Sequence, residues 1–220
     1  KDKLNQFAKC LEAERHYLTE AISDEIGKPA WEAQTEIQAM IGKVAISIEA
    51  FEKRCAEFTG GPAVTRFHPH GVVGVLGPFN FPGHLHNGHI VPALLANLVN
   101  GGVTTGQSLI ANHDIDGVFF TGSAHVGEKL KQAFANRLGK ILALEMCGNN
   151  PLVIDQVEDT NAAVLLTIQS AFLTAGQRCT CARRVTIPKV EWGDQLIEKL
   201  KAKTDTIIVD TPDAEPEPFM

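Results

Sequence analysis

Between residues 71 and 173, short apolar runs alternate with stretches of helical periodicity, and this alternation restricts the possible folds more than any other feature. The apolar runs are too short for helices and are bounded by glycine or proline, which is typical of buried strands. Parallel strands need a crossover connection, usually a helix, so strands and helices then alternate along the chain. The sequence therefore predicts an α/β fold with a largely parallel sheet.

The expected elements follow from this reading. Strands are predicted at 63–68, 71–76, 118–121, 141–144 and 151–154, and helices at 4–26, 31–58, 89–95, 128–137 and 162–173. The first two helices are expected to be scaffold, stopped by Gly27-Lys28-Pro29 and by Gly60-Gly61-Pro62. Trp31 and Phe51 are expected in the core.

Charge and composition exclude several classes of protein. A net charge of -6 argues against a nucleic-acid binder, which needs clustered positive charge. No run approaches the roughly 18 apolar residues of a membrane span, and residue 1 begins no signal peptide, so a cytoplasmic protein is expected. Five cysteines, an odd number, favour reduced thiols over a disulfide framework. The chain begins inside a helical pattern with no cap before Leu4 and stops in an extended segment at 216–220 with no closing element, which suggests a fragment.

The sharpest chemical signal is the cysteine loop, residues 174–184 (TAGQRCTCARR), which presents Cys179 directly after a predicted helix. Cationic groups favour the nucleophilic thiolate, and Arg178, Arg183 and Arg184 could supply them. The competing interpretation is a small buried structural cysteine.

Two spacings raise the possibility of a metal. Cys179 and Cys181 lack a second ligand pair nearby, and His84, His86 and His89 lack a neighbouring carboxylate to orient their rings. No metal site is predicted.

Four motifs then point to one family. Residues 176–179 (GQRC) and 144–148 (LEMCG) resemble the cysteine and glutamate motifs of the aldehyde dehydrogenase superfamily, 78–82 (PFNFP) resembles its asparagine loop, and 120–127 (FTGSAHVG) resembles its nucleotide-binding turn. All four stand in the family's order. The resemblance implies a Rossmann-type, parallel-sheet nucleotide-binding domain over 1–146, followed by the start of an α/β catalytic domain over 147–220.

The resemblance also implies a role for each motif residue. Cys179 would attack the aldehyde, Asn80 and the Cys179 backbone N–H would stabilise the oxyanion, and Glu145 would activate the water that hydrolyses the thioester. The implied cofactor is NAD, with NADP possible. Its contacts would come from Gly122, Ser123, Gly127, Phe79 and Leu144.

Residues 80–95 and 177–184 are most similar to the branch of the family that acts on N-succinylglutamate 5-semialdehyde, in arginine catabolism. This similarity implies a small semialdehyde substrate. For a full-length family member it also implies a homo-oligomer.

Three departures from the family pattern affect this interpretation. After Ala96 the family continues with a strand–helix unit that holds the adenosine ribose, whereas here Asn97 follows at once, so about 30 residues are expected to be missing. Either the gene lacks this unit or the sequence omits it. Cys147 stands where the family usually has glycine, which would be strained at positive φ. The chain also stops before most of the catalytic domain.

Two other functions compete with a dehydrogenase. The first is an inactive remnant that cannot hold a dinucleotide because the ribose-binding unit is missing. The second is a thiol hydrolase that pairs Cys179 with a histidine, which is disfavoured because no histidine lies beside Cys179 or Glu145 in their loops.

Overall fold

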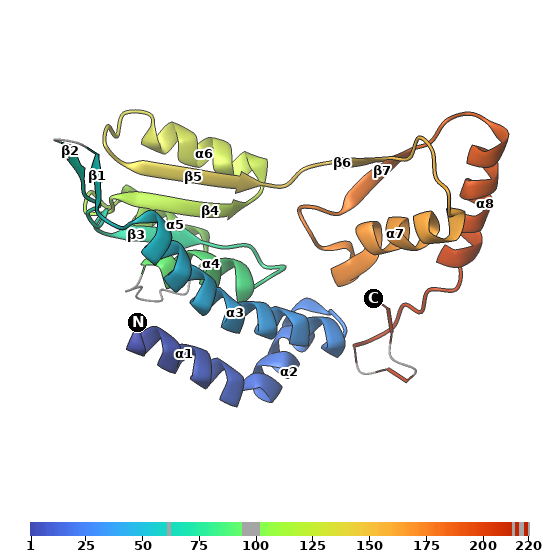
Figure 1. Cartoon of the computed structure of the whole chain (residues 1–220), viewed down its shortest axis with the longest axis horizontal. Helices are drawn as coiled ribbons and strands as arrows, with labels where there is room; N and C mark the ends of the chain where they lie inside the picture. Colours follow the sequence, from blue (N-terminus) through green and yellow to red (C-terminus); the bar gives the residue numbers. More distant parts are fainter. Residues whose placement is uncertain (61–62, 94–101, 213, 216–217, 220) are drawn as a thin grey trace. The chain divides into compact units, whose positions relative to one another are not determined.

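A computed structural model describes residues 1–60, 63–93, 102–212, 214–215 and 218–219 of the chain (Figure 1). Its internal contacts define two units. Unit 1 consists of Lys1–Leu18 and Gln34–Met146, and unit 2 consists of Thr19–Ala33 and Cys147–Met220. The assignment of 1–146 to nucleotide binding and of 147–220 to catalysis stays a prediction.

Unit 1 is built on a three-stranded parallel sheet in the order β3-β4-β5. The strands are β3 (Val73–Leu76), β4 (Gly117–Gly122) and β5 (Ile141–Met146). Val73 lies opposite Gly117, which lies opposite Ile141, so the three strands start in register. The predicted parallel α/β class is confirmed, because these strands read as the continuous apolar runs of buried parallel strands.

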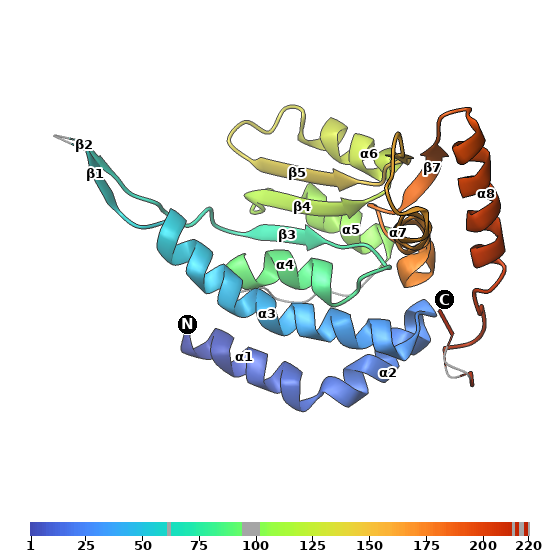
Figure 2. The same ribbon diagram turned by 45° about the vertical axis from the view of Figure 1, so that its right-hand side comes forward.

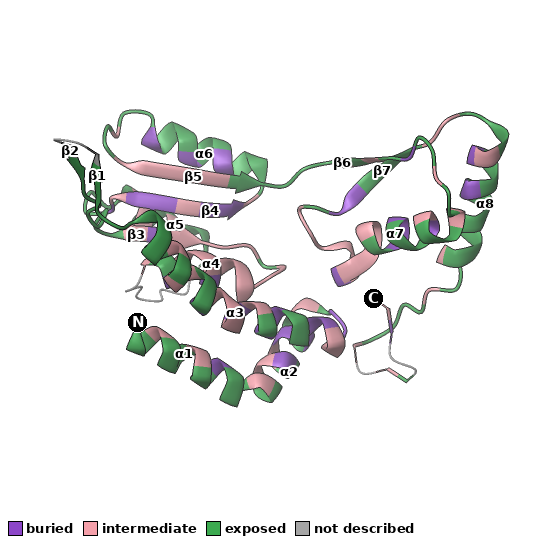
Figure 3. Cartoon of the chain, viewed as in Figure 1, coloured by how far each residue is buried: buried purple, intermediate pink, exposed green. Residues whose placement is uncertain are grey.

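Helices cover both faces of this sheet, as Figure 2 shows. Val118 and Phe120 of β4 form a core with Leu130 and Phe134, and residues of both α5 and α6 pack around it. Phe119 points to the opposite face, where its ring stacks on His89 of α4. The helices are α4 (His84–Ala93), α5 (Val103–Ala111) and α6 (Ala124–Phe134). Figure 3 shows that the middle strand β4 is largely buried, whereas β5 is mostly intermediate.

The amino-terminal region departs from the predictions in two places. The helix predicted over 4–26 is two helices, α1 (Asp2–Ala13) and α2 (Arg15–Ile26), which break at Glu14 within a polar stretch. The helix predicted over 31–58 is α3 (Ala30–Arg54) and ends sooner, because Phe58 begins a short antiparallel hairpin, β1 (Phe58–Gly60) with β2 (Ala63–Thr65).

The prediction that Phe51 lies in the core was wrong, since this residue of α3 is 56% exposed. Trp31 is partly buried. No helix in the described ranges has the length and apolar character needed to cross a membrane.

Unit 2 carries a second parallel strand pair joined by a helix. Strand β6 (Asn150–Val153) pairs with β7 (Ala182–Thr186), and its other elements are α7 (Thr160–Phe172), the 3₁₀ turn η1 (Leu173–Gly176) and α8 (Glu191–Thr204). Asp159 starts α7 by accepting the N–H groups of Asn161 and Ala162. The core of this unit joins Ile154, Val164, Ile168 and Leu196.

Candidate active site

The cysteine loop follows α7 and holds two thiols in different environments. Cys181 is buried, and its Sγ lies 3.9 Å from the carbonyl oxygen of Leu173. Cys179 lies in a turn and is only partly buried. Of these two thiols, Cys179 is therefore the one that a small molecule can reach.

The backbone before Cys179 has an unusual conformation. Thr174 and Ala175 have φ values of 60° and 51°, and Gly176 follows at 66°. The left-handed region suits glycine but crowds the Cβ of other residues, so two non-glycine residues in succession need support from their surroundings.

Hydrogen bonds from three elements hold the loop in place. Asn150, at the start of β6, donates its side-chain N–H groups to the carbonyl oxygens of Cys179 (2.5 Å) and Cys181 (3.2 Å). The side chain of Gln177 donates to the carbonyl of Ile26 at the end of α2. Glu32, in the first turn of α3, accepts from Thr174 and Arg178.

The arginines of the loop are engaged in its own framework. Arg178 pairs with Glu32 at 3.0 Å, so a buried carboxylate balances its charge. Arg183 donates to the carbonyl of Gly176 at 2.8 Å and Arg184 to that of Asn149 at 3.0 Å. These contacts show the arginines bracing the backbone, a role that the sequence interpretation did not include.

The asparagine loop joins β3 to α4 in unit 1. Asn80 is partly buried in it, and Phe79 beside it is 72% exposed. Glu36 of α3 is buried, and its Oε1 accepts the backbone N–H groups of Gly83 and His84, each at 3.0 Å. A carboxylate at this point also suits the positive end of the α4 dipole.

The three histidines after Asn80 have separate surroundings. The His89 ring stacks on Phe119 with centroids 5.1 Å apart, and burial lowers the pKa of His89, with Lys43 and His86 lowering it further. The His86 ring packs directly over Gly77. Among the residues that the structure describes, no three His, Cys, Asp or Glu side chains gather in a way that could hold a metal ion.

Glu145 is exposed near the carboxyl end of β5, where it lies opposite Thr121 of β4. Cys147, two residues further on, is exposed and is not among the described non-glycine residues with positive φ. The backbone strain that the sequence allowed for at Cys147 is therefore not present.

The predicted nucleotide-binding turn connects β4 to α6. Ser123 caps α6 by accepting the N–H of Val126 at 3.3 Å. Gly127 is buried where a Cβ would lie 2.4 Å from the Met146 sulfur, and the partly buried Leu144 packs against the adjoining core. A Cβ at Gly127 would therefore displace the side chain of Met146, which is 40% exposed.

Several of the predicted site residues lie at the carboxyl ends of the three strands of the unit 1 sheet. Asn80 and Phe79 follow β3, Gly122 ends β4, and Glu145 lies near the end of β5. In open α/β sheets ligands bind outside the carboxyl ends of the strands, and these residues lie at that edge. Cys179 belongs to unit 2.

Sequence reasoning missed Glu32, Glu36 and Asn150, the side chains that hold the two loops. One available signal was the spacing of the two glutamates, since Glu32 and Glu36 border the apolar stripe of α3 that contains Ile37 and Met40. A carboxylate at such a position needs a buried partner.

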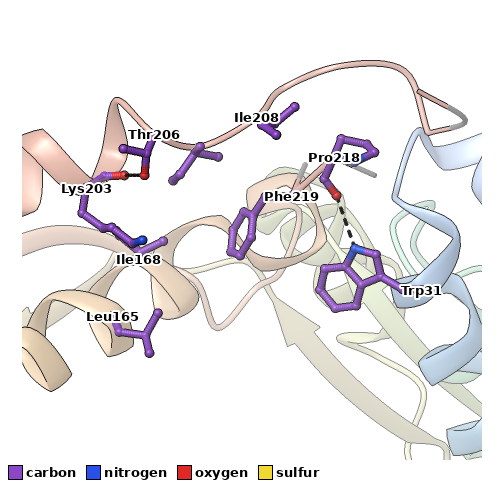
Figure 4. Close-up of a pocket in the computed structure, with 9 residues that line it drawn as sticks. Trp31, Leu165, Ile168, Lys203, Thr206, Ile208, Pro218 and Phe219 are labelled. Atoms are coloured by element: carbon purple, nitrogen blue, oxygen red, sulfur yellow. Dashed lines mark hydrogen bonds between the residues drawn. The ribbon is translucent and has the colours of Figure 1, made fainter. Parts of the chain in front are cut away.

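Two cavities among the described residues lie away from the predicted catalytic and cofactor-binding residues. A cavity of about 370 Å³ in unit 2 is shown in Figure 4, where the indole N–H of Trp31 donates to the carbonyl of Pro218. A groove of about 500 Å³ in unit 1 runs between α1, α3 and α4. None of the predicted catalytic or cofactor-binding residues lines either of them.

These features define the class of the protein. It is an α/β chain with a parallel sheet covered by helices on both faces, a glycine turn at the carboxyl end of a strand, and a loop in unit 2 that bears an accessible cysteine. Comparison with known proteins gives the family. The model of the aldehyde dehydrogenase family matches residues 1–97 and 91–220, and the chain belongs to this family.

Two curated relatives are both N-succinylglutamate 5-semialdehyde dehydrogenases. The protein from Pseudomonas fluorescens is 48% identical and that from Ectopseudomonas mendocina 46% identical, each over 254 positions that cover 99% of this chain and 52% of the relative. The chain thus spans about half the length of the curated relatives it matches.

The same alignments bear on the predicted gap after Ala96. They run over 254 positions against 220 residues in the chain, so at least 34 positions have no counterpart here. The two family matches meet at residues 91–97. From residue 94 this stretch lies outside the described residues, and the loss of a strand–helix unit at this point stays a prediction.

Solved structures agree on the fold. A glyceraldehyde-3-phosphate dehydrogenase from Methanocaldococcus jannaschii, solved with NADP, is 24% identical with a TM-score of 0.89, covering 98% of this chain and 55% of its own. An aldehyde dehydrogenase from Brucella melitensis is also 24% identical with a TM-score of 0.89, covering 99% of this chain and 52% of its own. The predicted aldehyde dehydrogenase-like fold is confirmed.

Proposed function

We propose that this chain is part of an NAD(P)-dependent aldehyde dehydrogenase that oxidises N-succinylglutamate 5-semialdehyde to the carboxylic acid, in arginine catabolism. The observation that carries the proposal is the 48% identity to a dehydrogenase of that name over 99% of the chain, which includes the loop with the accessible Cys179. By analogy with its family, the full-length protein would be a cytoplasmic homo-oligomer.

Cys179 is the proposed nucleophile. Its thiolate attacks the aldehyde carbon and forms a tetrahedral thiohemiacetal, whose oxyanion needs hydrogen-bond donors already in position. The side-chain amide of Asn80 and the backbone N–H of Cys179 are the proposed donors. Glu145 then acts as the general base, removing a proton from the water that cleaves the thioester and releases the acid.

A nicotinamide dinucleotide, when bound, supplies the hydride acceptor for this oxidation. The amino end of α6 suits its phosphates, because the first turn of this helix carries no acidic residue and Ser123 is exposed. Gly122, Ser123, Gly127, Phe79 and Leu144 are the proposed contacts for NAD, with NADP possible. The side chain of Phe79 is exposed and therefore accessible to the cofactor.

A second candidate function follows from the alignment positions without a counterpart here. A chain that lacks the ribose-binding unit would keep the fold but not hold the dinucleotide. Among the described residues, no strand pairs with the other edge of β3, next to which such a unit would extend the sheet. The alternative is therefore an inactive remnant of an aldehyde dehydrogenase.

Two measurements separate these functions. Isothermal titration of the folded 220-residue chain with NAD and NADP should give micromolar binding for the dehydrogenase and no heat of binding for the remnant. If turnover of the semialdehyde is found, Cys179→Ala should abolish it while Cys181→Ala, at the buried thiol, leaves the cysteine at 179 active. Retained turnover in Cys179→Ala would reject the proposed mechanism.

A further inference from the structure

Glu32 is a buried carboxylate at the amino end of α3, with its side chain 2% exposed. Its Oε2 accepts the backbone N–H of Thr174 at 2.5 Å. Its Oε1 accepts the Thr174 hydroxyl at 2.9 Å and the Arg178 guanidinium at 3.0 Å. Both oxygens therefore bind the chain just ahead of Cys179, and Thr174 lies 142 residues from Glu32 in sequence.

Thr174 links these contacts into a closed network. Its hydroxyl donates to Glu32 and accepts from Nε of Arg178 at 2.7 Å, and its carbonyl accepts the N–H of Gln177 at 2.9 Å. Thr174, which begins the left-handed stretch, and Arg178, two residues after its end, are thus tied to the same carboxylate. Non-glycine residues persist in this conformation only where the surroundings hold them.

Burying a carboxylate is unfavourable unless hydrogen bonds and an opposite charge compensate it. Glu32 receives both, and its partners come from the cysteine loop. Replacing only the carboxylate would remove the acceptor shared by the Thr174 N–H and the Arg178 guanidinium, so the arrangement of the cysteine loop depends on Glu32.

We propose that Glu32 is a positioning residue for Cys179: it holds Thr174 and Arg178 so that the left-handed turn that begins at Thr174 presents the thiol. The proposal rests on the proposed function only in taking Cys179 as the nucleophile. Glu32 acts through the loop and does not itself contact the reacting atoms.

The test compares Glu32→Ala and Glu32→Gln with the unaltered 220-residue chain by hydrogen exchange. We expect amide exchange in residues 173–179 to rise by at least about tenfold in Glu32→Ala, while α7 residues such as Val164 and Ile168 keep their protection. Glu32→Gln keeps one acceptor oxygen for the Thr174 N–H, so it should restore part of that protection. Glu36→Gln is the matched control, because it removes a buried carboxylate from the same helix and should leave 173–179 unchanged.

Alkylation by iodoacetamide, located by peptide mass spectrometry, gives a second readout. The exposed Cys10 serves as an internal reference for the partly buried Cys179. In Glu32→Ala the ratio of the Cys179 rate to the Cys10 rate should move by about fivefold or more toward its value in the urea-unfolded chain. Neither measurement needs cofactor or substrate, so a failed dehydrogenase assay leaves this result independent.

Three results would overturn the proposal. Unchanged exchange and an unchanged alkylation ratio in folded Glu32→Ala would show that other contacts position the loop. A uniform loss of protection across unit 2, with no excess at 173–179, would show a purely structural role. Failure of both variants to fold would show the same.

Discussion

The side-chain amide of Asn150 donates a 2.5 Å hydrogen bond to the carbonyl oxygen of Cys179, and its second contact, at 3.2 Å, is to the carbonyl of Cys181. One residue at the start of β6 thus holds the backbone on both sides of Thr180. Because β6 pairs with β7, which begins at Ala182, the strand pair itself fixes where the cysteine turn ends.

Asn150→Asp should destabilise unit 2, because it replaces the amide donor with a carboxylate facing two carbonyl oxygens. We expect the free energy of unfolding to fall by about 2–3 kcal/mol, and by less in Asn150→Ala. Both tryptophans, Trp31 and Trp192, belong to unit 2, so fluorescence during urea unfolding reports on it. Asn149→Ala, at an exposed neighbour, should unfold at the wild-type midpoint, and an equal midpoint for Asn150→Asp would contradict the assigned role.

Gly77→Ala should disturb the start of the asparagine loop. A Cβ at Gly77 would lie 2.0–2.3 Å from three atoms of the His86 ring, so the ring must move. We expect a loss of about 1–3 kcal/mol in the stability of unit 1, measured by circular dichroism during urea unfolding. The double variant Gly77→Ala/His86→Ala should recover much of this loss, whereas no recovery would place the strain elsewhere.

The three parallel strands of unit 1 could be predicted because burial on both faces leaves a continuous apolar run, as in Val118-Phe119-Phe120. Strand β7 gave no such signal: Arg183 and Arg184 are exposed, and the strand is identified only by its pairing with β6. Helices α5 and α8 were also missed. The former lies in the glycine- and threonine-rich segment 102–111, where helix propensity is low.

The motifs of the candidate site can be found in the sequence, but the residues that hold their loops cannot. Glu32 and Thr174 are far apart in sequence, and a glutamate in the first turn of a helix usually faces water. The left-handed conformation of Thr174 and Ala175 has no local signal either, because glycine or asparagine would be expected there. Both depend on contacts made only in the folded chain.

Gly27 and Gly42 should respond to alanine with opposite signs. Gly27 ends α2 at a φ of 72°, with no atom within 4 Å of the position that a Cβ would take, so Gly27→Ala should cost about 1 kcal/mol through backbone conformation alone. Gly42 lies inside α3 with the same open space, and Gly42→Ala should stabilise by about 0.5–1 kcal/mol because alanine loses less entropy in a helix. Thermal unfolding of both variants provides the measurement, and a loss of stability in both would show hidden steric contacts.

The stability of unit 1 should depend on pH through His89. Burial, together with Lys43 and His86, lowers the pKa of His89 below its ordinary value of 6.5. Above pH 6.5 the imidazole is neutral in both the folded and the unfolded chain, and its contribution to stability is complete.

As the pH falls below 6.5 the unfolded chain takes up the proton first, so the free energy of unfolding declines until the pH passes the lower pKa of His89 in the folded state. We therefore expect the wild type to lose stability as the pH falls below 6.5, the ordinary pKa of histidine. His89→Gln should remove that part of the slope while losing the stacking on Phe119 at every pH. His125→Gln, at an exposed histidine of α6, should keep the wild-type slope. Parallel slopes for wild type and His89→Gln, from urea unfolding at several pH values, would show that the ring is as easily protonated in the folded chain as in the unfolded one.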